Sequence, residues 1–181
     1  MEQTHPFHFL ANCFSYPEDE DILEGTVDAL SLLAEDMGLE GDQVHIERMP
    51  LLDHQAEYVR LFINGPGGVA APPYASVYIN NAGVLRQQGY EQALAMYCRA
   101  GLEPKESCES PDHISHELAF IGLLVELGDH RLLDTFIDDH FSVWYPAFHE
   151  RLIRAEPTPF YEILAQVTNL CLHQIRKEVF A

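Results

Sequence analysis

A cluster of acids and histidines near the middle of the chain has the residue types needed for acid–base or metal chemistry. The cluster runs from Glu109 to Glu117 and contains Asp112, His113 and His116. In a helix, His113 and Glu117 would share one face because they are four residues apart, as are Asp112 and His116. Such groups can bind a divalent cation or transfer a proton. They are therefore the first candidates for a functional site.

The order of these residues does not match a known catalytic motif. The sequence reads H-x-x-H-E, whereas zincins use H-E-x-x-H, in which two histidines four residues apart reach one ion. No G-x-S-x-G element supplies a nucleophile. Helix capping combined with partner contact explains the cluster better, so we expect no catalytic residue, no metal site and no bound cofactor. The alternative is a metal-dependent helical hydrolase that uses His113, His116 and Glu117.

The residues around the cluster predict a helix that starts at Ser110-Pro111. Ser110 can accept from a free amide of the first turn, and Pro111 loses only an amide that has no partner there. Asp112 would then lie in the first turn, where the helix dipole favours a carboxylate. The sequence is almost wholly apolar from Leu118 to Leu127, which predicts a buried helix.

Apolar residues recur at helical spacing through most of the chain, and no segment has a convincing strand pattern. The expected helices cover about 5–15, 18–37, 51–63, 81–101, 133–144 with an interruption at Pro146, and 160–179. We therefore predict an all-α fold over residues 1–181. Gly101 to Glu109 is the best candidate for a hinge between an N-terminal lobe, 1–103, and a C-terminal lobe, 110–181. Gly89 is expected to weaken the helix that has Leu85, Leu94 and Tyr97 as apolar anchors.

The expected helix at 51–63 has apolar residues on two faces. One stripe is Leu52, Ala56, Val59 and Ile63, and the other is Leu51, Tyr58 and Phe62. Such a helix either packs between other elements or offers one side to a partner, and packing is the commoner outcome. After it, residues 64–78 have no helical or alternating period. A loop of this length in a compact domain usually has a function.

The composition narrows the class of partner. Among 181 residues, 47% are hydrophobic, and 29 acidic against 10 basic residues give a net charge of −19. Binding to nucleic acid is not expected, because it depends on cationic contacts, whereas a basic partner suits this charge. We see no signal peptide and no apolar run long enough to cross a membrane, and the four cysteines include no C-x-x-C pair. These features predict a cytoplasmic protein with reduced thiols.

Four segments, in order, resemble the TorD/DmsD/NarJ family of chaperones for molybdenum-containing redox enzymes. Residues 58–66 are similar to its Y-x-x-L-F helix end, and residues 72–78 to its P-P-Y-E-S-V-Y loop, with Ala75 where the family often has glutamate. Residues 109–113 match E-x-P-D-H, and residues 136–148 are similar to its F-x-x-x-H and W-x-P-x-F segment. The order and spacing of all four segments make the resemblance specific.

The resemblance implies an all-helical cytoplasmic chaperone that binds the twin-arginine signal peptide or the N-terminus of a molybdopterin oxidoreductase catalytic subunit until its cofactor is loaded. An apolar groove with an acidic rim would suit such a leader, which joins a positive segment to a modest apolar one. The predicted peptide-binding residues, by resemblance and by this reasoning, are Leu61, Phe62, Pro72, Pro73, Tyr74, Ser76, Tyr78, Glu109, Pro111, Asp112 and His113.

Four questions stay open at the level of sequence. They are which reductase is the client, whether the target is a leader or a mature N-terminus, whether a molybdenum cofactor or guanine nucleotide binds, and whether the protein is a monomer or a homodimer that exchanges lobes.

Overall fold

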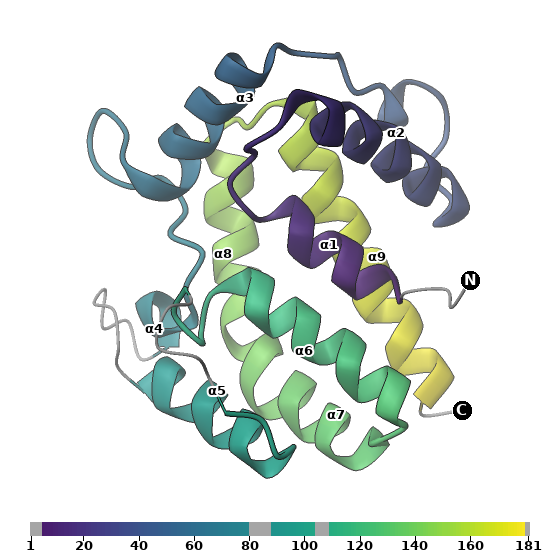
Figure 1. The fold of residues 1–181 in the computed structure, drawn as a ribbon, viewed down its shortest axis with the longest axis vertical. Coiled ribbons are helices and arrows are strands. Elements are labelled where there is room, and N and C mark those ends of the chain that lie inside the picture. The colour runs from purple at the N-terminus through teal and green to yellow at the C-terminus, as the bar shows by residue number, and fades with distance from the viewer. Residues whose placement is uncertain (1–4, 80–87, 104–108, 180–181) are drawn as a thin grey trace. The chain divides into compact units, whose positions relative to one another are not determined.

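The computed structural model describes residues 5–79, 88–103 and 109–179, and helices dominate these ranges (Figure 1). No β-strand forms within them, and the one isolated antiparallel bridge joins Tyr74 to His113. The predicted all-α fold class is confirmed. None of the described helices combines the length and the hydropathy needed to cross a membrane.

The chain divides into two compact units. The first contains the residues up to Phe14 together with Pro72–Glu150, and the second contains Ser15–Ala71 together with the residues from Arg151 onward. This division differs from the expected lobes, because residues 72–103 and 109–150 belong to one unit. Hydrogen bonds explain the difference: the Tyr97 hydroxyl donates to the Pro111 carbonyl at 2.7 Å, and the Ala75 N–H donates to the Asp112 carbonyl at 3.0 Å.

The first unit contains α1 (Pro6–Cys13), α4 (Ala75–Tyr78), α5 (Gln88–Arg99), α6 (Ile114–Leu127), α7 (His130–Phe136), the π-helical turn η4 (Ile137–Phe141) and α8 (Ser142–Arg154), whose last turn enters the second unit. Helices α1 and α6 pack side by side (Figure 1). The His8 ring packs directly on Gly122, where a Cβ would lie 2.8 Å from His8 Nε2. The helix continues through Pro146, so the interruption expected there is instead a π-helical turn that ends five residues earlier.

Helix α5 covers residues 88–99 of the predicted segment 81–101, and the predicted residues 81–87, Leu85 among them, lie outside the described residues. Its Gly89 is a packing residue. A Cβ at this position would come within 2.5 Å of the Ser76 amide nitrogen, so only glycine lets α5 touch the backbone of α4.

The second unit contains α2 (Glu20–Asp36), η1 (Gly41–Val44), α3 (Leu51–Tyr58), the π-helical turn η2 (Val59–Ile63) and α9 (Pro159–Val179). Helix α2 packs on α9 and buries the predicted stripe of Leu23, Val27, Leu30 and Ala34. Helix α3 runs directly into η2, which ends at Asn64 as the sequence predicts.

Candidate functional site

The turn before α6 brings two of the sequence motifs together. Helix α6 begins at Ile114, and His113 is its N-cap, with its Nδ1 atom accepting from the Ser115 N–H. The predicted start at Ser110-Pro111 is therefore wrong. The reason is that His113 has extended backbone, with ψ 139°, and pairs with the 72–75 loop: the Ile114 N–H donates to the Pro73 carbonyl at 2.9 Å.

Asp112 is fully buried and holds this arrangement together. Its Oδ2 atom accepts from the Ser76 N–H at 3.0 Å, and its Oδ1 atom accepts from the Ser110 hydroxyl at 2.5 Å. The carboxylate thus caps the start of α4 and fastens it to the turn before α6. The sequence predicted that Asp112 lies in the first turn of a helix, and this prediction is wrong because α6 begins only at Ile114.

His113 is also buried, and its ring contacts Tyr74 edge to face, with the centroids 5.0 Å apart. Burial lowers the pKa of His113 to about 4, although the nearby acids Glu109 and Asp112 act in the opposite direction. The imidazole is therefore neutral at neutral pH. A neutral ring can accept at Nδ1, which the cap of α6 requires.

Glu117 forms a second buried polar network, one turn into α6. Its Oε1 atom lies 2.7 Å from His140 Nε2, and its Oε2 atom accepts from Trp144 Nε1–H at 2.8 Å. All three side chains are fully buried. The network ties α6 to η4 and α8, which supply His140 and Trp144 respectively.

Both members of the Glu117–His140 pair bind a proton more tightly than usual. Burial raises the pKa of Glu117, and its attraction to His140 and its hydrogen bonds offset only part of that rise. Burial opposes charge on His140, but the Glu117 carboxylate outweighs it and raises the pKa of the imidazole. His140 Nδ1 also faces Gln92 Oε1 at 3.4 Å, so both ring nitrogens face acceptors. This geometry favours the imidazolium form.

An apolar cavity of about 490 Å³ opens beside this turn, within the first unit. Apolar side chains dominate its lining: Tyr97, Leu102, Pro111, Ala119, Phe120 and Leu123. The polar members are His8, His116, Glu103 and Glu109, and both glutamates are exposed. The cavity therefore combines an apolar lining with two accessible carboxylates.

The structure brings most of the predicted peptide-binding residues into the first unit but gives them different roles. Pro73, Tyr74 and Ser76 contact the turn that carries Asp112 and His113, and Tyr78 stacks on Trp144 with centroids 5.8 Å apart. Glu109 and Pro111 line the cavity. Pro72 lies at the start of the 72–75 loop, before Pro73 and Tyr74.

The second unit holds the other two predicted residues. Leu61 and Phe62 are buried there, and Phe62 packs against Tyr58 and Tyr161 with centroids 5.0 and 5.3 Å apart.

Sequence reasoning missed most of the cavity lining. Ala119, Phe120 and Leu123 lie in an apolar helix that was expected to be buried all round, although Ala119 and Leu123 are only half-buried. The available signal was the spacing of His116, Ala119 and Leu123, which places them on one face of α6. Nothing in the pattern distinguishes such a face from core.

The alternative metal-dependent hydrolase is not supported. Glu117 has both carboxylate oxygens occupied, and His116 Nδ1 lies 3.0 Å from the Ser110 carbonyl. His113 is turned toward Ser115 and Tyr74. Across 5–79, 88–103 and 109–179, no group of three or more His, Cys, Asp or Glu side chains could hold a metal ion.

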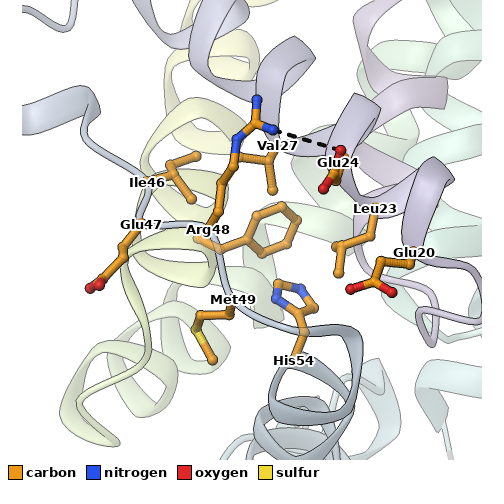
Figure 2. Close-up of a pocket in the computed structure, with 10 residues that line it drawn as sticks. Glu20, Leu23, Glu24, Val27, Ile46, Glu47, Arg48, Met49 and His54 are labelled. Carbon is orange, nitrogen blue, oxygen red and sulfur yellow. Dashed lines mark ion pairs between the residues drawn. The ribbon is translucent and has the colours of Figure 1, made fainter.

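A smaller cavity in the second unit has room for about one water molecule. Its volume is about 30 Å³, and Figure 2 shows Leu23, Met49 and His54 around it. The Arg48 guanidinium at its edge is paired with Glu24 at 3.7 Å and with Asp28 at 2.7 Å. This cavity is too small to receive a side chain of a partner.

Comparisons with known proteins agree with the resemblance seen in the sequence. A family model described as "Nitrate reductase delta subunit" matches residues 19–150. Chaperone protein TorD of Aliivibrio fischeri is 25% identical over 99% of this chain and 83% of its own length. Tat proofreading chaperone DmsD of Salmonella typhi is 32% identical over 64% of this chain and 56% of its own length, so this chain spans little more than half of that relative.

A solved structure supports the same conclusion about the fold. It is the crystal structure of a protein from Archaeoglobus fulgidus described as a redox enzyme maturation protein. The two structures superpose with a TM-score of 0.62 at 27% identity, over 92% of this chain and 94% of the other.

Proposed function

Because the chain belongs to the nitrate reductase delta subunit family, and its relatives TorD and DmsD are chaperones and not enzymes, we propose that it binds the twin-arginine leader of a molybdopterin oxidoreductase precursor. Binding would hold the catalytic subunit in the cytoplasm until its cofactor is loaded. The protein itself then needs neither a catalytic residue nor a cofactor. The names of the relatives support this choice, since one is a Tat proofreading chaperone.

The observation that carries the proposal is the apolar cavity with two exposed glutamates at its edge. A leader of this class joins a cationic segment to a modest apolar segment. The lining of Tyr97, Phe120 and Leu123 suits the apolar segment, and Glu103 and Glu109 suit the arginines. An Arg–carboxylate hydrogen bond contributes about 1.5–3 kcal/mol, and less where it is exposed.

The geometry assigns Asp112 a supporting role in this proposal. Its carboxylate has no exposure and already accepts from Ser76 and Ser110, so it holds the turn that presents Glu109 and Pro111 to the cavity. Direct contact with an incoming arginine would require this turn to open, because the carboxylate has no exposed surface. The exposed carboxylates need no such rearrangement.

The overall charge supports the same partner. A net charge of −19 accelerates the encounter with a cationic leader, and added salt weakens that effect. Binding should therefore be faster at low ionic strength, which stopped-flow fluorescence with a labelled leader would measure.

Isothermal titration with a synthetic twin-arginine leader peptide tests the proposal. We expect Glu103→Gln/Glu109→Gln to weaken binding about tenfold, the loss of one to two exposed charge-assisted hydrogen bonds. The matched control is Asp138→Asn/Asp139→Asn, which removes the same charge from exposed acids of η4 that do not line the cavity. Equal affinity of the two double variants would reject the cavity as the leader site, and no binding by the wild type would reject the leader as the target.

A mature N-terminus is the other candidate target. Pull-down of a client with and without its leader separates the two, because only a leader-dependent chaperone loses the shortened client.

A further inference from the structure

The helix formed by α3 and η2 buries only one of its two apolar faces. The face with Tyr58, Leu61 and Phe62 lies in the core of the second unit. On the other face, Leu52 is 73% exposed and Ile63 is 54% exposed. The sequence favoured packing on both sides, and the second unit leaves one side accessible.

A groove of about 350 Å³ runs along the accessible face. Tyr16, Leu52, Ala56 and Val59 form its apolar surface, and Gln55, Arg60 and Asn64 complete it. The order Leu52, Ala56, Val59, Ile63 advances by four, three and four residues, the spacing that packs one helix against another in a coiled coil. The π-helical turn η2 forms the last part of this face, and such turns are frequent at functional sites.

The charges at this groove favour a cationic partner. Its one cation, Arg60, is neutralised by Glu57, with Nε to Oε2 at 2.6 Å and Nη2 to Oε1 at 2.9 Å. Asp53 is exposed next to Leu52. Gln55 donates to the Pro17 carbonyl at 2.8 Å, which places the groove beside the acidic run that begins at Glu18.

We propose that the α3–η2 face docks an amphipathic helix of a partner protein, with apolar residues at four-three-four spacing and basic residues beside them. The apolar side chains of that helix would pack between Leu52, Ala56 and Val59, and its basic residues would meet Glu18 and Asp53. This surface lies in the second unit and shares no residue with the apolar cavity of the first unit that is proposed to bind the leader. It therefore does not depend on the proposed function. A second copy of the chain is a poorer occupant, because it would bring a like charge of −19.

Fluorescence anisotropy with a labelled 18-residue peptide tests the docking surface. The probe carries leucines at four-three-four spacing with arginines beside them, and the control peptide has the same composition with its leucines spread around the helix. We expect Leu52→Glu to weaken binding of the probe at least tenfold. The matched protein control is Ile22→Glu, since Ile22 is 70% exposed on α2 of the same unit and does not line the groove; it should bind as the wild type does.

Two further measurements complete the test. The double variant Glu18→Gln/Asp53→Asn should bind the probe a few-fold more weakly at low salt, and the difference should vanish in 0.5 M salt because exposed charges are then screened. The proposal would be overturned if Leu52→Glu and Ile22→Glu weakened binding equally, or if the wild type bound both peptides equally well. Absence of binding of the probe to the wild type would also overturn it. So would sedimentation that shows a dimer dissolved by Leu52→Glu, since the face would then belong to a second copy.

Discussion

Each unit of the molecule contains a π-helical turn whose basic residue pairs with a buried glutamate, but the two pairs are built differently. In the second unit, Arg60 of η2 pairs with Glu57, three residues earlier in the same helix. In the first unit, His140 of η4 pairs with Glu117, which lies on another helix and 23 residues away. One pair is local and partly solvated, and the other is a fully buried tertiary contact.

The local pair clamps a loop. Arg60 also donates to the carbonyls of Ala155 and Glu156, at 3.0 and 3.2 Å, and Glu57 accepts from the Thr158 N–H at 2.9 Å. Glu156 has a φ of 50°, in the left-handed region that side chains other than glycine rarely adopt. The clamp therefore stabilises a strained turn between α8 and α9.

The buried pair serves a different purpose. It joins α6, whose first turn follows the Asp112-His113 motif, to η4 and α8. A loss of this contact would leave buried polar groups unpaired on three elements. In both units a π-helical turn positions a basic side chain against a glutamate. The burial of each pair decides how much it contributes to the free energy of unfolding.

The largest expected effect comes from Glu117→Ala. This change leaves the His140 imidazole and the Trp144 N–H without their acceptor in a fully buried site, so the free energy of unfolding should fall by about 3–5 kcal/mol. Urea denaturation followed by circular dichroism measures it. A loss below about 1 kcal/mol would show that water enters the site and that the two pairs differ less than the structure indicates.

A smaller effect is expected from Glu57→Ala. It removes the carboxylate that accepts from Arg60 and from the Thr158 N–H, but Arg60 keeps two carbonyl acceptors and access to water, with 38% of its side chain exposed. We expect a loss of about 1–2 kcal/mol by the same measurement. Asp53→Ala, an exposed acid on the same helix, should change stability by less than about 0.5 kcal/mol. A loss from Glu57→Ala as large as that from Glu117→Ala would remove the distinction between a solvated and a buried pair.

The sequence predicted the fold better than it predicted the site. Periodic stripes such as Leu23, Val27 and Leu30 gave the helices, because burial of one helical face depends on local spacing. The start of α6 was misplaced, because the pairing of His113 with Tyr74 is a contact between distant segments that no local pattern encodes. The unit boundaries were missed for the same reason, since Tyr97 reaches Pro111 across the expected hinge.

The candidate site shows the same limit. The motif residues Asp112 and His113 were identified from the sequence, but their burial and their hydrogen bonds depend on Ser76 and Tyr74 in another segment. The contact of these residues with a peptide remains a prediction. Glu103 and Leu123, in contrast, belong to no motif, and only their position in the cavity lining makes them candidates.

The most subtle prediction concerns pH and uses glutamine in place of each glutamate. The folded-state pKa of His140 is raised above its ordinary value of 6.5, so its contribution to stability is complete below pH 6.5 and is lost as the pH rises through the raised pKa. The folded-state pKa of Glu57 is lowered from 4.5: burial opposes this shift, but Arg60 and the Thr158 amide outweigh it. Its contribution is therefore complete above pH 4.5 and is lost as the pH falls through the lowered pKa.

Glu117→Gln separates these two windows. The amide can accept from Trp144 and donate to a neutral His140, so the hydrogen bonds survive while the cause of the raised pKa disappears. Urea denaturation from pH 3.5 to 9 should show that the destabilisation by Glu117→Gln shrinks as the pH rises, first above pH 4.5 because the pKa of Glu117 is itself raised, and further above pH 6.5 as His140 loses its proton. The destabilisation by Glu57→Gln should instead stay constant above pH 4.5 and shrink below it. Parallel pH profiles for the two variants would mean that His140 is neutral in the folded protein. The Glu117–His140 pair would then keep its geometry with an imidazole that does not change its protonation state, just as the guanidinium of the local Glu57–Arg60 pair does not.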